Sequence, residues 1–222
     1  KLASGSIRNL DLIPCDIDLL GEDLGGGQIS GVFPSMESLR QQAKAVVNDR
    51  VFLRNALADV INDYNYVLID CPPNLYLMTQ NALVASDWYV ITAIPDHLST
   101  IGLSILRKKV DKIADLLKTA STLTGDGHPL AAALLGGVVF VKVRIGGDVI
   151  TNTHRDRMER IARDVVGPGL CFKTFTTELI GFSEAAENSI PVWEHTSTNA
   201  KRAARKGEYQ AITKEFLQRF LT

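Results

Sequence analysis

The sequence predicts an α/β fold in which a doubly wound, mostly parallel sheet carries helices on both faces. Two observations lead to this class. Short apolar runs of strand length alternate with longer segments whose apolar residues recur every three or four positions. The apolar runs lack the alternation of half-exposed strands, which indicates burial on both faces, as in parallel sheets. The 222 residues show no linker, shift in composition or internal repeat, so one domain is expected over residues 1–222.

The first predicted elements are a short strand and a long helix. Leu10–Pro14 has the character of a strand that ends at its proline. Ser35 is suited to cap a helix, and apolar residues recur at helical spacing over Ala43–Ile61. We therefore expect an amphipathic helix that ends near Tyr64 and is interrupted near residues 48–49.

Strands and helices alternate through the rest of the chain, which is the pattern of a parallel sheet with crossover helices. The expected strands are Trp88–Ile94, Leu134–Val141 and Leu170–Phe175, and the expected helices are Leu75–Ala85, Ile101–Leu117, Val149–Val166, Leu179–Asn188 and Lys201–Phe220.

One further apolar run ends in a carboxylate and is the strongest indication of function in the sequence. Tyr66–Ile69 is apolar or aromatic throughout, Asp70 follows, and Pro72 and Pro73 fix an extended exit. Open α/β sheets bind ligands at the carboxyl ends of their strands, and P-loop nucleotidases hold Mg²⁺ with such an aspartate. We predict that Asp70 orients Mg²⁺ through a metal-bound water; the alternative is an aspartate that only caps the next turn.

Composition narrows the class of protein. The net charge of −1 provides no overall basic excess, so nucleic-acid binding would need a local patch. Three distant cysteines and four scattered histidines lack the spacing of a disulfide framework or a zinc site, and the cytoplasm is the default compartment. The sequence shows no signal peptide and no apolar run near the ~20 residues of a membrane span. No lysine follows Gly25–Gly27, which is expected to be a surface loop rather than a phosphate loop.

The motif at Asp70 continues into the next predicted helix. Asp70–Pro73 and Thr79–Asp87 together resemble the Asp-x-Pro-Pro and Thr-x-Asn-Ala-Leu-x-Ala-x-Asp of the ParA/Soj branch of the ParA/MinD P-loop ATPases. Weaker matches, persuasive by their order, are Leu10–Leu20, Ile94–Leu103, Gly136–Val139, Ser183–Ala185 and Ile190–Val192. The resemblance covers nearly the whole chain.

The resemblance implies a function and a set of site residues. Proteins of this family bind ATP and Mg²⁺, dimerise around two nucleotides and hydrolyse ATP slowly, and the ATP-bound dimer binds DNA non-specifically. They segregate plasmids, chromosomes or other cargo with a ParB-like partner that stimulates hydrolysis. The implied protein is a cytoplasmic, nucleoid-associated ATPase. Asp70 is its catalytic and metal-binding residue, and Pro72, Pro73 and Thr177 are further cofactor-binding residues. Thr79 and Asn81 are expected to be structural.

Two departures from the family pattern qualify these roles. The family's phosphate loop, Lys-Gly-Gly-x-Gly-Lys-Thr-Thr, and its Asp-x-Asp-Pro-Gln motif are missing, and the first residue is Lys1 rather than Met. Such a loop supplies most of the phosphate binding. We therefore expect a fragment, inactive by itself, of a protein whose phosphate loop lies upstream, rather than a degenerate relative. In addition, Thr176–Glu178 stands where the family has Ile-Pro-Arg near the adenine, which reverses the charge at Glu178.

Two basic runs are candidates for DNA contacts. Like charges at the start of the last predicted helix oppose the helix dipole, and binding to DNA phosphates would explain them, but so would a solvated face with Glu208 as a counter-charge. The residues of this run are Lys201, Arg202, Arg205 and Lys206. In the second run acidic residues alternate with basic ones, so a solvated face is expected; it consists of Arg155, Asp156, Arg157, Glu159, Arg160, Arg163 and Asp164.

Two other functions stay open. A non-catalytic interaction protein would keep the fold, a partner surface and the basic helix without hydrolysing ATP. The other is a metabolic ATPase of the same superfamily, such as an amidotransferase-linked synthase. This function would not explain the basic residues at 201–206, and such enzymes fit the Thr-x-Asn-Ala-Leu pattern less well. A phosphate loop encoded upstream of this sequence would favour the ATPase over the interaction protein.

Overall fold

The computed structural model describes residues 9–14, 27–31, 33–125, 130–147, 149–178 and 200–221, with residues 200–206 described as backbone only. The contacts divide the chain into two compact units. The first contains the described residues within Lys1–Leu19, Val90–Ile101 and Gly137–Thr222, and the second those within Leu20–Tyr89 and Gly102–Gly136. The expectation of a single domain over residues 1–222 stays a prediction.

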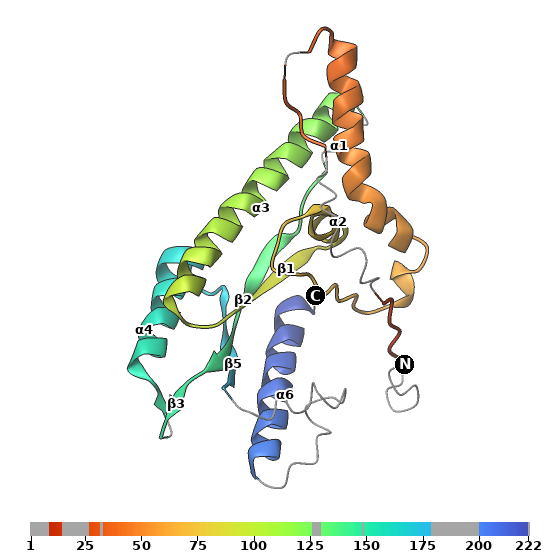
Figure 1. The fold of residues 1–222 in the computed structure, drawn as a ribbon. Coiled ribbons are helices and arrows are strands. Elements are labelled where there is room, and N and C mark those ends of the chain that lie inside the picture. The colour runs from red at the N-terminus through yellow and green to blue at the C-terminus, as the bar shows by residue number, and fades with distance from the viewer. Residues whose placement is uncertain are drawn as a thin grey trace. The chain divides into compact units, whose positions relative to one another are not determined.

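The chain has the predicted mixed α/β fold, in which the strands of a parallel sheet alternate along the sequence with helices (Figure 1). The sheet contains β1 (Trp88–Ala93), β2 (Leu134–Val143) and β5 (Cys171–Thr177), in the order β1-β2-β5. β2 and β5 are parallel. The central residues of β2 are buried, which agrees with a strand covered on both faces.

Two backbone features shape β2. A Cβ on Gly137 would lie 2.6 Å from the Leu170 carbonyl oxygen and 2.8 Å from a ring carbon of Phe172, so only glycine fits there. Near the other end, the register against β5 leaves β2 with one extra residue between Phe140 and Val143. Lys142 lies in this bulge with a φ of 53°, an unusual value for a residue with a side chain. The bulge redirects the carboxyl end of β2.

The second unit is mainly helical. α1 (Met36–Leu57) begins with the predicted cap, since the Ser35 hydroxyl accepts the Ser38 N–H at 3.1 Å and the Ser38 hydroxyl accepts the Ser35 N–H at 3.3 Å. The helix continues through residues 48–49 without the expected interruption, and a 3₁₀ turn, η2 (Ile61–Asp63), follows.

Two further helices complete the core of this unit. They are α2 (Leu77–Ala85) and α3 (His97–Thr124). Of α3, only residues 102–124 belong to this unit. Small and branched residues join them to α1, so the packing is close. The buried residues that carry these contacts are Ala43, Val46, Leu83, Val84, Val110, Ile113, Leu117, Ala120 and Ala133.

The first unit places a helix along the outer edge of β5. α6 (Ala200–Phe220) lies beside this strand (Figure 1). A hairpin of β3 (Ile145–Gly146) and β4 (Val149–Ile150) follows β2, and α4 (Asn152–Arg160) continues into a π-helical segment, η3 (Ile161–Val166). The predicted helix over residues 149–166 therefore starts three residues later and ends in a wider turn.

The predicted buried strand before Asp70 is wrong for this structure. Residues 66–69 belong to no strand of the described sheet, and Leu68 is 80% exposed. An apolar run becomes a strand only when neighbouring strands take up its backbone hydrogen bonds, and β1, β2 and β5 pair without it. Leu10–Pro14 is likewise exposed and not a strand. The expected helix over residues 179–188 and the family-like motifs at 183–185 and 190–192 lie outside the described residues.

Candidate functional site

The Asp70 turn, defined as residues 70–76, leads from the exposed apolar segment into α2. Asp70, Pro72 and Pro73 are all exposed, so the carboxylate is accessible to a ligand. The Asn74 N–H donates to the Pro72 carbonyl at 2.8 Å, and the Asn74 side-chain oxygen accepts the Tyr76 N–H at 3.2 Å. These bonds form a tight turn of the kind that asparagine favours, directly after the prolines.

Asp70 also affects its neighbour. Partial burial raises the pKa of the Cys71 thiol, and the negative charge of Asp70 raises this pKa further. The thiol therefore stays protonated near neutral pH, which argues against a nucleophilic role for Cys71.

A single accessible carboxylate is compatible with a magnesium site. The described residues contain no group of three or more metal-binding side chains. Mg²⁺ retains several waters and is commonly bound through one or two carboxylates together with phosphate oxygens. Asp70 fits that mode of binding and does not fit a cage built from protein ligands alone.

Polar residues also meet at the carboxyl ends of β2 and β5. The Thr177 N–H and hydroxyl both donate to the Glu208 carboxylate of α6, at 3.0 and 2.7 Å. Glu178, at the position of the family's arginine, accepts from Arg144 Nε at 2.8 Å in an exposed ion pair. Arg144 restores a positive charge beside Glu178 and was not singled out from the sequence, because the two residues are 34 positions apart.

A buried histidine lies next to this edge. His154 is 6% exposed, and its Nδ1 accepts the Arg144 N–H at 3.1 Å, so the ring proton of the neutral form is on Nε2. Asp96, just after β1, accepts the Ser99 N–H at 2.7 Å at the start of α3. This hydrogen bond lowers the pKa of Asp96; burial opposes the shift, and His154 adds to it. The sheet therefore presents charged groups where α/β proteins bind ligands.

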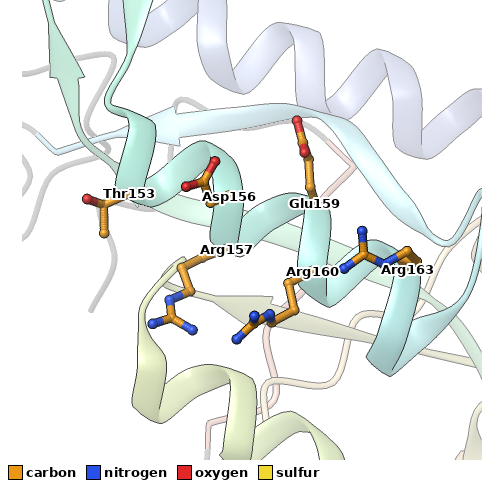
Figure 2. Close-up of a pocket in the computed structure, with 6 residues that line it drawn as sticks. All are labelled: Thr153, Asp156, Arg157, Glu159, Arg160 and Arg163. Atoms are coloured by element: carbon orange, nitrogen blue, oxygen red, sulfur yellow. The ribbon is translucent and has the colours of Figure 1, made fainter.

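The two basic runs differ in what the structure describes. Lys201, Arg202, Arg205 and Lys206 lie in the first turns of α6, and their side chains are outside the described part of the chain. On α4, charges separate by sign: Figure 2 shows Arg157 and Arg160 pointing the same way, away from Asp156 and Glu159.

These arginines line an open surface hollow of about 450 Å³ together with Thr153, Asp156, Glu159 and Arg163. Arg163 is paired with Asp164 at 2.7 Å, whereas Arg157 and Arg160 form no ion pair within the described residues. The helix therefore presents two adjacent cations to solvent rather than an evenly mixed face. No described helix is both long enough and apolar enough to cross a membrane.

Comparisons with known proteins agree with this architecture. A model of a family described as an AAA domain matches residues 2–123. The chain is 28% identical to the sporulation initiation inhibitor protein Soj of Bacillus subtilis over 187 residues, which cover 84% of this chain and 60% of that protein. It is 25% identical to the chromosome-partitioning ATPase Soj of Treponema pallidum over 224 residues, with coverage of 98% and 71%.

Solved structures support the fold. A McdA variant of Cyanothece in complex with ATP superposes with a TM-score of 0.56 and 16% identity, covering 78% of this chain and 61% of that one.

The chain spans 57% of the length of an uncharacterised Mycobacterium tuberculosis protein that is 27% identical over 219 residues. It thus corresponds to somewhat more than half of several relatives.

Proposed function

Because this chain belongs to the ParA/MinD-type family of P-loop ATPases, we propose that its protein binds ATP with Mg²⁺ and uses ATP hydrolysis to partition DNA or another cargo. The observation that carries the proposal is the accessible Asp70 turn, which runs directly into the helix with the family's Thr-x-Asn-Ala-Leu pattern. Asp70 would hold Mg²⁺ through a water, and Pro72 and Pro73 would fix the turn beside the γ-phosphate. Thr177 is the predicted cofactor-binding residue of the other unit, where its N–H and hydroxyl donate to Glu208.

Non-specific DNA binding by an ATP-bound dimer is the second part of the proposal. Lys201, Arg202, Arg205 and Lys206 are the first candidates for phosphate contacts. The adjacent cations Arg157 and Arg160 support a second contact surface, since neither forms an ion pair within the described residues. Such contacts neutralise the DNA backbone without reading bases, and they would associate the protein with the nucleoid.

A partner protein completes the proposal. The curated relatives include chromosome-partitioning proteins of Treponema pallidum and Myxococcus xanthus. We propose a ParB-like partner that stimulates hydrolysis and thereby releases the protein from DNA. A plasmid, a chromosome or another cargo would each be compatible with this cycle.

The decisive experiment measures Mg²⁺-dependent ATP hydrolysis by the whole protein and by its Asp70→Ala variant. Loss of the metal-binding carboxylate should reduce kcat by about 10²–10³, the range found when one transition-state contact is removed. Asp63→Ala, at an exposed aspartate in the same unit, is the matched control and should leave kcat unchanged. Wild-type hydrolysis in the Asp70→Ala variant would refute the assigned role.

The 222 residues alone provide a separate test. They lack the family's phosphate loop, so we expect weak or no binding of Mg²⁺-ATP by calorimetry. Tight binding would contradict our assignment of phosphate binding to a loop absent from these residues. A non-catalytic interaction module is the second candidate, favoured by the position of residues 66–69 outside the sheet. Absence of hydrolysis by the whole protein would support it.

A further inference from the structure

The Asp70 turn is connected to α1 by a series of hydrogen bonds. After the prolines, the Leu75 carbonyl accepts from Gln80 Nε2 at 2.8 Å. The other end of the same side chain, Gln80 Oε1, accepts from Arg50 Nε at 2.7 Å. Gln80 thus joins the last residues of the turn to the middle of α1, 30 positions earlier in the sequence.

Arg50 is an unusual residue for this place. It is only 2% exposed, and its Nη1 donates to the Val46 carbonyl at 3.0 Å within α1. Burial lowers its pKa, and the nearby charge of Asp49 opposes that effect, but an arginine keeps its proton. No carboxylate forms an ion pair with Arg50 within the described residues. A buried cation held mainly by neutral acceptors is costly and needs a reason.

The orientation of Gln80 depends on Arg50. An amide side chain can reverse its oxygen and nitrogen, and an Arg50 that only donates fixes the oxygen toward α1. The nitrogen must then face Leu75, where it holds the carbonyl of the turn. A neutral partner at position 50 would remove this selection.

We propose that Arg50 is a positioning residue for the Asp70 turn and acts through Gln80. This inference rests on the proposed function of Asp70. Arg50 selects one orientation of the Gln80 amide, the amide fixes the Leu75 carbonyl, and the turn then presents Asp70 at one position. The precise placement of a metal-binding carboxylate affects the rate of the chemical step more than the affinity for substrate.

The test combines amide hydrogen exchange with two substitutions that cut the connection at different points. Gln80→Glu keeps an acceptor for Arg50 and removes the donor to Leu75. Arg50→Gln replaces the donor-only cation by a neutral amide that can also accept, which removes the selection of one Gln80 orientation. Both should increase exchange in the peptide covering residues 70–80 by roughly fivefold, the effect of losing one hydrogen bond. Arg54→Gln, at an exposed arginine one turn further along α1, is the matched control and should change nothing.

The outcomes separate this inference from the proposed function. Faster exchange confined to α1 in Arg50→Gln, with residues 70–80 unchanged, would overturn the inference and leave the role of Asp70 intact. In the whole protein, Arg50→Gln should lower kcat about tenfold and change KM for ATP less than about twofold. If the whole protein does not hydrolyse ATP, the proposed function fails, while the exchange experiment still tests the connection.

Discussion

The side chain of Asn81 bonds both Leu53 and Asp49, two residues one turn apart in α1. Its Oδ1 accepts the Leu53 N–H at 3.1 Å, and its Nδ2 donates to the Asp49 carbonyl at 2.7 Å. Leu53 and Asp49 are four positions apart, so the amide spans one turn of α1. A second bond from Nδ2 to the Leu77 carbonyl, at 3.1 Å, ties the same amide to α2. The asparagine of the Thr-x-Asn pattern therefore joins two helices.

Asn81→Ala should destabilise the protein. The Asn81 residue is 2% exposed and its side chain bonds part-buried backbone groups of α1 and α2, so its removal should cost about 2 kcal/mol. Urea unfolding measures the change. The matched control, Asn48→Ala at an exposed position of α1, should stay within about 0.5 kcal/mol of wild type. Equal effects for the two variants would show that the connection between α1 and α2 adds no stability.

Gly137→Ala should destabilise the protein more than most substitutions that add one methyl group. The new Cβ would lie 2.6 Å from a backbone oxygen, which cannot move without disturbing the pairing of β2 and β5. We expect a loss of roughly 2–3 kcal/mol in the free energy of unfolding. Gly102→Ala makes the same chemical change in α3, where nothing lies within 4 Å, and should be neutral or stabilise by about 0.5–1 kcal/mol. A tolerated Gly137→Ala would contradict the described register.

Glu215→Gln should weaken the attachment of α6 to β5 in a pH-dependent way. The carboxylate accepts the Lys173 and Thr174 N–H groups at 2.9 Å and pairs with Arg219 at 2.9 Å. Burial raises the pKa of Glu215, but these hydrogen bonds outweigh it and lower the pKa overall. At pH 7 the substitution should cost about 1–3 kcal/mol.

The sign of the pH effect follows from the lowered pKa. The folded state favours the charged carboxylate, so its stabilisation is complete above the unfolded pKa of about 4.3 and is lost as pH falls through the folded value. The difference between wild type and Glu215→Gln should therefore shrink below about pH 4.3. Glu178→Gln, in an exposed pair, is the control and should cost at most about 1 kcal/mol. Unfolding curves from pH 3 to 7 give both comparisons.

Replacing Arg157 and Arg160 together by Ala should weaken DNA binding by the whole protein. If each contacts one phosphate, the slope of log affinity against log salt should decrease in magnitude by about two. Arg163→Ala removes a cation already paired with Asp164 and should have a smaller effect. Titrations at several salt concentrations measure the slope, and an unchanged slope would mean that this face of α4 is only solvated.

Local signals were sufficient to predict several elements from the sequence. The Ser35 cap depends on residues three positions apart, and α1 begins where this pattern predicts. The α/β class and the approximate extents of β1, β2 and α6 also follow from periodicity along one segment. The family resemblance places a functional residue at Asp70, and this residue is exposed in the structure.

The remaining features depend on distant residues. The strand expected over residues 66–69 needed neighbours that no local pattern specifies, and the described sheet does not supply them. The Arg144–Glu178 pair and the Arg50–Gln80 bond connect residues 34 and 30 positions apart. The periodicity of α1 shows that position 50 faces inward, but it does not reveal that Arg50 meets an amide of the next helix.

The contacts of α6 with β5 leave the β1 edge of the described sheet as the place where a further strand can pair. Glu208 and Glu215 occupy donors on the outer edge of β5, and Arg219 occupies the Gly169 and Cys171 carbonyls at 3.1 and 2.7 Å. An incoming strand would find these backbone groups of the edge already bonded. Within the described sheet, the order β1-β2-β5 leaves β1 as the other end. Any strand added to this sheet, from the same polypeptide or from another, must therefore dock against β1 unless α6 first detaches.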